Sequence, residues 1–463
     1  MMSPEEFRAE AHKVVDWMAD YLRDIRQYPV LPQVEPGALI DQLPAHGPEH
    51  GVPMDAILAD FQKLVMPGIT HWNHPRFHSY FSISASGPGI LGEMIAAALN
   101  VQHMLWKASP SATELEQVTL GWLREWWGLA PEFFGIIHDT ASTASMHAIL
   151  AARELASPET RLSGQHARLI LYESEHTHNS VDKGALTVGI GKDNLRRIAA
   201  DQEFRMIPEA LERSIQADLA AGHKPFCVVA TLGTTSSSSI DQLPAIAEIA
   251  KRYSLWLHID AAYGGPAALL EEYRYILDGS AHADSIVINP HKWLFTPVDL
   301  SILYTRRPEI MRRAFSLDET PAYLVTAQHE RALNFSEYAL PLGRRFRSLK
   351  LWFVLRYYGR EGIVRVLREH IRMAQMLAEE VRRDPRFELA APVPFSLVCL
   401  RYRGSDEDNQ KLFEQVNSSG KAFLSSTVLH GKFVLRFAIG NIATTEQDIR
   451  ETWDLIKSFV PHI

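Results

Sequence analysis

Between residues 168 and 304 the chain alternates short apolar, strand-favouring runs with longer stretches whose apolar residues recur at helical spacing. The helical stretches include Ile207–Ala221 and Pro244–Tyr253. Strands that are apolar throughout and are separated by helices predict a mostly parallel sheet covered on both faces. Ligands bind beyond the carboxyl ends of such strands, so the residues after each run are the functional candidates. The runs are Arg168–Tyr172, Phe226–Thr231, Leu255–Ile259, Ser285–Ile288 and Leu300–Tyr304.

The remaining parts of the chain have different patterns, so 463 residues divide into three predicted units. Residues 1–84 begin with a capped amphipathic helix at Ser3-Pro4 and continue through a Pro- and Gly-rich connector. This segment has little core of its own, and we expect it to pack on a second subunit. Residues 85–350 form the large α/β domain. Residues 351–463, with a long helix over Arg360–Arg383 and a closing helix from Thr445, form a small α/β domain.

Charge and hydropathy exclude several classes of protein. The net charge of −8 provides no basic field for nucleic acid. The N-terminus carries acids and lacks the apolar core of a signal peptide, and the most apolar window, Gly89–Leu99, is short and interrupted by Glu93. Cys227 and Cys399 lie in apolar runs and are predicted to be reduced and buried. The sequence therefore predicts a cytoplasmic protein that binds neither nucleic acid nor membrane.

Two charged residues follow neighbouring predicted strands. Asp260 ends the run Leu255–Ile259, and Lys292 follows Ser285–Ile288 within the stretch NPHKW. Taken singly, the lysine would keep its amine in water and the aspartate would cap a helix. Together at matching strand ends, they suit a partly desolvated amine that forms a Schiff base and an acid that faces a pyridine nitrogen. This pairing predicts pyridoxal 5'-phosphate as the cofactor.

A phosphate-bearing cofactor also needs an anion site. The run Thr140 to Ser145 consists of small and hydroxyl residues and opens the helical stretch Met146–Leu155, where free amides can bind phosphate. The segment Gly233-Thr234-Thr235-Ser236 follows the strand Phe226–Thr231 and could reach the ring or the phosphate. Both signals are weak alone, because Ser/Thr runs are also common helix caps.

Two other motifs are interpreted as structural. His71, His74 and His78 suggest a metal site, but no cysteine or paired acid completes one, so zinc is not predicted. The sequence Gly189-Ile190-Gly191 lacks the third glycine and the following acid of a dinucleotide-binding motif.

Several motifs in the same order now mark a resemblance. HIDAAYGG, NPHKW and LGRRFRSLKLW, with THWNHPRFHSYF and WKASPSATELEQV, resemble the group II pyridoxal-phosphate-dependent decarboxylases, and within them the aromatic-L-amino-acid type. The similarity runs from EFRAEAHKVVDWMADY to VLRFAIGN. It implies the α/β fold type I of pyridoxal-phosphate-dependent transferases, with a mostly parallel central sheet, an N-terminal helical segment and a small C-terminal α/β domain. It also implies a homodimer with active sites at the subunit interface.

The resemblance assigns roles around the cofactor. Lys292 would hold the cofactor covalently, Asp260 would pair with its ring nitrogen, and His178 would stack on the ring and help to place the substrate carboxylate. Tyr323, on a loop reaching the other subunit's site, would be the proton donor. The remaining cofactor contacts implied are Ala141, Ser142, Thr235, Ala262 and His291, and the implied substrate contacts are Trp72, Tyr80, Phe81, Ile83, Met104 from the partner and Gly343, which leaves space.

The implied activity is decarboxylation of an L-amino acid to its amine and CO2. The aromatic residues in the predicted pocket favour a flat substrate of the dopa, tyrosine, tryptophan or phenylalanine type. Open alternatives are a decarboxylase of histidine or an acidic amino acid, a decarboxylation-dependent aldehyde synthase, and an aminotransferase, which would need Lys292 and Asp260 but not His178 with Tyr323. A non-catalytic scaffold would be expected to have lost some of these groups.

The chain departs from the family pattern at three places. Asp139-Thr140 and Thr143 replace the usual glycine and glutamate around the phosphate loop. Residues Gln102–Leu105 replace a common glycine-phenylalanine pair, and residues 334–338 lack the usual Asp-Tyr and Trp-Gln elements. These changes alter the predicted phosphate site and one wall of the predicted pocket, and they leave the preferred amino acid open.

Overall fold

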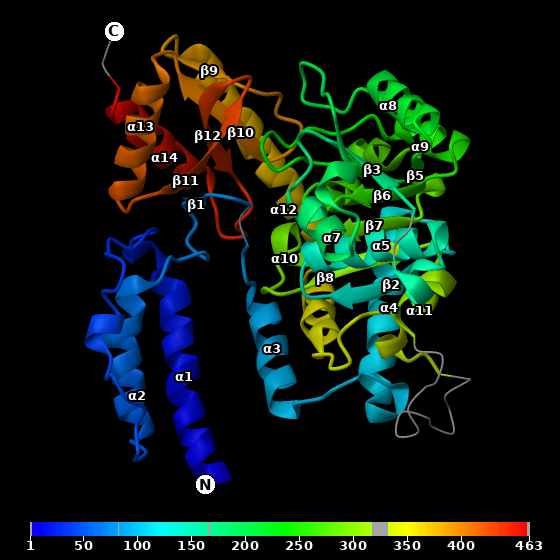
Figure 1. Cartoon of the computed structure of the whole chain (residues 1–463). Helices are drawn as coiled ribbons and strands as arrows, with labels where there is room; N and C mark the ends of the chain where they lie inside the picture. Colours follow the sequence, from blue (N-terminus) through cyan, green and yellow to red (C-terminus); the bar gives the residue numbers. More distant parts are fainter. Residues whose placement is uncertain (1, 82, 165–166, 317–331, 461–463) are drawn as a thin grey trace.

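The computed structural model describes residues 2–81, 83–164, 167–316 and 332–460. Figure 1 shows a large body built around a central sheet, with a smaller orange and red unit from the C-terminal part of the chain beside it. Two blue helices, α1 (Pro4–Asp24) and α2 (Met54–Asp60), lie side by side and project away from both. The chain is thus arranged as a sheet-centred body with a helical arm.

The central sheet has seven strands in the order β2-β8-β7-β6-β5-β3-β4. Strand β8 is antiparallel to both of its neighbours, and the other pairs are parallel, which confirms the mostly parallel sheet predicted from the sequence. Strands β2 and β4 were not predicted; β4 carries two arginines, so it lacks the apolar run of a buried strand. The strands are β2 (Phe134–His138), β3 (Leu169–Ser174), β4 (Leu195–Ile198), β5 (Lys224–Thr231), β6 (Trp256–Asp260), β7 (Ser285–Ile288) and β8 (Ser301–Thr305).

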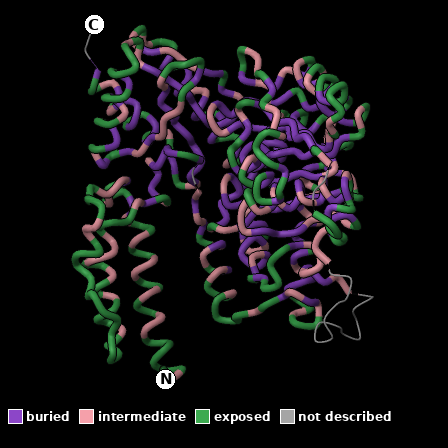
Figure 2. Tube along the Cα trace, viewed as in Figure 1, coloured by how far each residue is buried: buried purple, intermediate pink, exposed green. Residues whose placement is uncertain are grey.

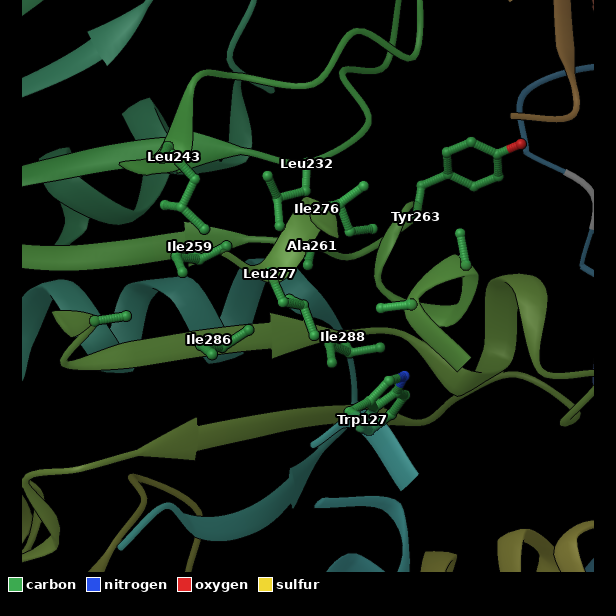
Figure 3. Packing of buried hydrophobic residues seen from close by; sticks show 14 of the residues in the cluster. Trp127, Leu232, Leu243, Ile259, Ala261, Tyr263, Ile276, Leu277, Ile286 and Ile288 are labelled. Atoms are coloured by element: carbon green, nitrogen blue, oxygen red, sulfur yellow. The ribbon is translucent and has the colours of Figure 1, made fainter. Parts of the chain in front are cut away.

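Helices cover both faces of this sheet. Alternate residues of a strand point to opposite faces, so they belong to two hydrophobic clusters, a first and a second, one on each face. Val229 packs with α5 (Ala141–Ala156), α7 (Ser180–Thr187) and α11 (Pro308–Phe315), whereas its neighbour Val228 packs with the helices of the opposite face. In Figure 3, Ile259, Ile286 and Ile288 lie in the second cluster with Trp127. The helices of that face are α4 (Pro110–Trp127), α8 (Pro208–Ala220) and α9 (Leu243–Arg252).

The smaller unit is a second sheet in the order β1-β11-β12-β10-β9. Its first strand, β1 (Phe77–His78), comes from the N-terminal part of the chain and pairs in parallel with β11. Helix α12 (Arg347–Arg383) breaks at Gly359, whose φ is 61°, and the sequence pattern predicted only the half after this glycine. The other elements are β9 (Phe387–Leu389), β10 (Leu397–Tyr402), α13 (Asp406–Ser418), β11 (Phe423–Leu429), β12 (Lys432–Ala438) and α14 (Glu446–Ser458).

The N-terminal helix begins where the sequence predicts. The Glu6 amide donates to Ser3 Oγ at 3.1 Å, and the Ser3 amide donates to the Glu6 carboxylate at 2.7 Å, forming a capping box. No residue of α1 is buried, and Figure 2 shows the arm in intermediate and exposed colours. The three-unit division stays a proposal, since β1 joins the C-terminal sheet and α12 crosses residue 350.

Cys227 and Cys399 are free thiols, and both are buried. Among the helices of the described ranges, none is both long enough and apolar enough to cross a membrane.

Candidate active site

A cavity of about 220 Å³ lies at the carboxyl ends of β5, β6 and β7. All eight residues expected to contact the cofactor line it: Ala141, Ser142, His178, Thr235, Asp260, Ala262, His291 and Lys292. The sheet topology brings these residues together from segments more than a hundred residues apart. The cavity is completed by Phe81, Thr140, Ser180, Thr231, Gly233, Tyr263 and Asn289.

Lys292 lies in the short helix α10 (Pro290–Trp293), which follows β7 directly. Its ammonium nitrogen is 5.4 Å from the centre of the Phe81 ring. Burial lowers the pKa of Lys292, the nearby Asp260 carboxylate opposes this change, and Arg436 lowers the pKa further. A lysine with a lowered pKa has a larger fraction of neutral, nucleophilic amine, as bond formation to a carbonyl requires.

Asp260 is the last residue of β6 and is only 7% exposed. Its Oδ1 accepts a hydrogen bond from the Ala262 amide at 3.0 Å, which leaves Oδ2 available to a ligand. The turn that follows is tight, because a Cβ on Gly264 would lie 2.3 Å from the Leu232 carbonyl oxygen. The small residues after Asp260 are therefore required by the backbone, as well as by the space for a flat ligand.

The anion site is formed by the start of α5. Ala141 and Ser142 occupy its first turn, where backbone amides have no partner within the helix. The Asp139 carboxylate accepts a hydrogen bond from the Thr140 amide at 2.6 Å and does not line the cavity. The negative charge that the sequence places beside this site is thus bound to the backbone outside the cavity.

His291 also lines the cavity and supplies a neutral donor. Its Nδ1 accepts a hydrogen bond from the Leu300 amide at 2.9 Å, so the ring proton is on Nε2. Burial lowers the pKa of His291 to about 3, with Lys292 contributing. An uncharged imidazole that donates from Nε2 suits a phosphate oxygen.

His178 follows β3 and has the same tautomer. Its Nδ1 accepts from the Ser180 amide at 3.2 Å and lies 2.7 Å from the Ser180 hydroxyl, so Nε2 carries the proton. Burial lowers its pKa first, and Lys292 adds to this effect. His178 therefore presents an N–H donor at the cavity.

Arg436 is a residue of this region to which the sequence reasoning gave no role. It lies on β12, is 3% exposed, and forms no ion pair with any residue that the structure describes. Its guanidinium donates to the Thr235 carbonyl at 2.6 Å and to the Ser236 carbonyl at 3.3 Å, and it lies 5.2 Å from the Phe81 ring centre. The signal in the sequence is a charged residue within the otherwise apolar strand VLRFA.

Three stacked aromatic rings support the cavity. The Phe81 and Tyr263 rings are 3.7 Å apart and nearly parallel, and Trp293 stacks on Tyr263 at 5.1 Å. The Tyr263 hydroxyl lies 2.7 Å from the Ser396 hydroxyl of the smaller unit. Tyr263 was not singled out in the sequence, although it stands in the same motif as Asp260.

The other predicted substrate residues lie outside this cavity in the single chain. Trp72 and Tyr80 stack on each other at 5.5 Å and are 37% and 53% exposed. Gly343 lies beside Gln102, whose side-chain oxygen would be 3.6 Å from a Cβ at residue 343. Ile83 and Met104 are partly buried away from the cavity, and Tyr323 lies outside the described residues.

The histidines of the THWNHPRFHSY segment have structural contacts. His71 Nδ1 lies 2.9 Å from the Tyr21 hydroxyl, and His78 Nδ1 lies 3.2 Å from the Ala438 carbonyl oxygen. Within residues 2–81, 83–164, 167–316 and 332–460, no group of three or more His, Cys, Asp or Glu side chains could hold a metal ion.

Comparisons with known proteins agree with this geometry. Residues 36–403 match the family model described as the pyridoxal-dependent decarboxylase conserved domain. The chain is 40% identical to tryptophan decarboxylase 2 of Oryza sativa subsp. japonica, over 98% of this chain and 95% of that protein. It is 38% identical to aromatic-L-amino-acid decarboxylase of Mus musculus, over 100% and 99% of the two chains.

Two further matches are a sequence relative named for a different product and a solved crystal structure. The chain is 38% identical to phenylacetaldehyde synthase of Arabidopsis thaliana, over 98% of this chain and 96% of that protein. The crystal structure of Oryza sativa TDC with PLP and tryptamine superposes with a TM-score of 0.96 at 36% identity, covering 99% of this chain and 98% of the other.

Proposed function

The chain belongs to the pyridoxal-dependent decarboxylase family, and on that premise we propose that it decarboxylates an aromatic L-amino acid to its amine. The observation that carries the proposal is the convergence of Lys292, Asp260, His178 and the α5 amides on one cavity. Each of these groups serves a different part of the same reaction.

The cofactor is pyridoxal 5'-phosphate, and the residues of the cavity fit it. The amides of Ala141 and Ser142 and the His291 Nε2–H would hold the phosphate, Asp260 Oδ2 would pair with the ring nitrogen, and Lys292 would hold the aldehyde carbon. When bound, the cofactor supplies an electron sink for the pair of electrons released with CO2.

The chain's own residues position the substrate and move its protons. The Asp260 carboxylate stabilises a positive charge on a group bound next to its Oδ2. The apolar surroundings strengthen this electrostatic interaction. The Nε2–H of His178 donates to the substrate carboxylate and orients it, and the lowered pKa of Lys292 keeps its amine neutral, and able to accept a proton, once the substrate amine has displaced it from the cofactor. Tyr323 is the proposed donor of the proton that replaces CO2 at Cα.

The proposed substrate class rests on the aromatic residues that the sequence predicts for the pocket, of which Phe81 lines the cavity. Phe81 presents a ring to the cavity, and Trp72 with Tyr80 forms a half-exposed aromatic stack nearby in sequence. Gly343 leaves room for a bulky side chain beside Gln102. Relatives named for tryptophan and aromatic L-amino acids support the same class.

We propose that two chains form a homodimer that completes these sites. Helix α1 has no buried residue, and its apolar side chains Phe7, Val15 and Leu22 are 61%, 41% and 39% exposed. Helix α3 (Gly87–Leu99) likewise exposes Leu91 and Leu99 at 54% and 56%. Apolar side chains on a projecting arm need a partner surface, and analytical ultracentrifugation should give twice the chain mass. The cytoplasmic location predicted from the sequence also stays a proposal.

A decarboxylation-dependent aldehyde synthase is the second candidate, because one relative at 38% identity is named phenylacetaldehyde synthase. The two activities share the cavity and differ in the product formed after CO2 leaves. If Tyr323 is the proton donor, Tyr323→Phe should divert the product from amine toward aldehyde.

The decisive experiment is incubation of the purified protein with a panel of L-amino acids, scored for CO2, amine, aldehyde and ammonia. We expect CO2 and amine from an aromatic amino acid, and neither from Lys292→Ala. Aldehyde with ammonia would support the synthase, and turnover restricted to histidine or acidic amino acids would contradict the proposed substrate class. The pure protein should also be yellow, and Lys292→Ala should lose the covalently held cofactor.

A further inference from the structure

A buried carboxyl group lies next to the segment that carries His178. Glu173 belongs to β3 and is 0% exposed, and alternation along the strand places its side chain on the face where Leu171 packs with α7. Arg197 Nε lies 3.3 Å from Glu173 Oε1, yet neither carboxyl oxygen accepts a hydrogen bond from a residue that the structure describes. An ionised Glu173 would therefore be a buried carboxylate with both oxygens unbonded, which is costly.

A proton on Glu173 removes this cost. Asp182, in the first turn of α7, is close enough for a side-chain hydrogen bond with Glu173, and two carboxyl groups can form one only when one of them is protonated. Burial raises the pKa of Glu173 to about 8, the Arg197 charge opposes this change, and Asp182 adds to it. At neutral pH Glu173 therefore carries the proton and donates to the Asp182 carboxylate.

Arg197, in β4, joins the same elements. Its Nη2 donates to the Asp182 carboxylate, and its Nη1 donates to the Ser174 carbonyl at 3.5 Å. Among the described residues, Arg197 and Asp182 are the charged groups that act on Glu173. The Cys227 thiol of β5 is also near Glu173 and is uncharged, because burial raises its pKa. The end of β3 and the start of α7 are thus held together by one guanidinium and one shared proton.

The loop between these two ends carries His178. The Ser180 amide donates to His178 Nδ1 at 3.2 Å, and the Val181 amide donates to the His178 carbonyl at 3.0 Å. Asp182 is in the same helical turn as these two donors. Burial lowers the pKa of His178, whereas the charge of Asp182 raises it. Both the place and the ionisation of His178 therefore depend on Asp182.

Helix α7 is also packed closely against the helix that begins the anion site. A Cβ on Gly184 of α7 would lie 3.2 Å from the Met146 Cα of α5, and Figure 1 shows the two helices side by side. Helix α5 provides the amides of Ala141 and Ser142. A displacement of the first turn of α7 relative to α5 therefore changes the position of His178 relative to the proposed phosphate site.

We propose that Glu173, through its hydrogen bond to Asp182, is the positioning residue for His178. The inference rests on the proposed function, in which His178 orients the substrate carboxylate. Loss of the Glu173 proton to solvent leaves two carboxylates side by side that share Arg197. Their repulsion displaces the first turn of α7, so the His178 Nε2–H no longer meets the substrate carboxylate in the right place.

Ligand binding tests this role without turnover. 3-Phenylpropionate offers a carboxylate to His178 but has no amine to react, and 3-phenylpropanamide is its uncharged control. The holoenzyme and Glu173→Gln, whose amide cannot ionise and still donates to Asp182, are titrated by isothermal titration calorimetry at pH 7 and pH 9.5. The Kd of 3-phenylpropionate should rise roughly threefold more in the unaltered enzyme than in Glu173→Gln. The Kd of 3-phenylpropanamide should change equally in both proteins.

Two outcomes overturn the proposal. One is an equal pH dependence of 3-phenylpropionate binding in the two proteins, and the other is no binding of 3-phenylpropionate at pH 7. Failure of the proposed function is visible separately, as no CO2 from any aromatic amino acid, whereas failure of the inference leaves CO2 release intact.

Variants of Arg197 test the same contact by a shift in pH. Arg197 lowers the pKa of Glu173, so Arg197→Gln should move the midpoint of the affinity loss to higher pH, and Arg197→Lys should return it. Asp284→Asn is the matched control, because burial also raises the pKa of Asp284 but this residue precedes β7, at the edge of the sheet opposite the cavity. An unmoved midpoint in Arg197→Gln, or an equal shift in Asp284→Asn, would refute the role of Glu173.

Discussion

Replacing Arg436 by methionine would remove a buried positive charge while keeping most of the side-chain volume. The guanidinium donates to the carbonyls of Thr235 and Ser236 and to the Ser425 hydroxyl, and no carboxylate among the described residues offsets its charge. Each buried acceptor left without a donor costs ~1–3 kcal/mol. We therefore expect Arg436→Met to destabilise the segment that carries Thr235 and to weaken cofactor binding by at least tenfold, which corresponds to ~1.4 kcal/mol.

The same substitution changes the electrostatic environment of Lys292. The Lys292 amine and the Arg436 guanidinium lie 5.4 and 5.2 Å from the Phe81 ring centre, so their separation is at most about 11 Å, the sum of the two distances. At an effective dielectric constant of about 20, two unit charges at this distance repel by ~1.5 kcal/mol, a factor of about ten in the fraction of neutral amine. Arg436 lowers the pKa of Lys292, so its removal should raise that pKa and slow attack by the amine.

The assay is the rate at which the apoprotein acquires the visible absorption of lysine-bound pyridoxal phosphate, measured from pH 6 to pH 10. Arg436→Met should couple about ten times more slowly near neutral pH and approach the unaltered rate at high pH. Arg401→Met is the matched control, because Arg401 is also a buried arginine of the smaller sheet but pairs with Asp406 at 2.9 Å. If both variants lose stability and neither shifts the pH profile, the electrostatic argument is refuted and Arg436 is only structural.

Three further predictions follow from the described contacts. Asp260→Asn removes the carboxylate that raises the pKa of Lys292. We therefore expect that pKa to fall further, as measured by the rate of cofactor coupling, and kcat to drop on the order of 10²-fold, as measured by decarboxylation. Gly343→Val adds methyl groups beside Gln102 and should lower kcat/KM for tryptophan about tenfold more than for tyrosine. Equal decreases in kcat/KM for the two substrates would show that residue 343 does not line the substrate pocket. Burial raises the pKa of Glu173 to about 8, so the folded chain binds a proton that the unfolded chain releases, and stability should fall between about pH 5 and pH 8. Glu173→Gln should flatten this fall in thermal unfolding scans.

Sequence reasoning could name Asp260 and Lys292, which line the candidate cavity, because both follow buried strands. Asp260 and Lys292 each stand just after an apolar run, and parallel strands place such positions at one edge of the sheet. The opposite holds for Trp72, Gln102 and Gly343, which come from distant segments without a common element. Their arrangement depends on tertiary packing and on the proposed second chain, so substrate choice could not be predicted with equal success.

Arg436 and Asp241 were missed for a different physical reason. A single charged residue in an apolar strand or after a Ser-rich turn carries no local pattern, and its meaning depends on what it contacts across the fold. Here the two residues of opposite charge contact the connection after β5 at different points: Asp241 accepts from the Thr231 amide, and Arg436 donates to the Thr235 and Ser236 carbonyls. Asp241 belongs to the connection that follows β5 in the central sheet, whereas Arg436 belongs to β12 of the smaller sheet. Any shift between the two units would therefore change the wall of the cavity. The Ser/Thr run of residues 234–239 is therefore held from both units, since Ser239 donates to the Phe204 carbonyl of the larger body and Arg436 of the smaller sheet donates to the Thr235 and Ser236 carbonyls.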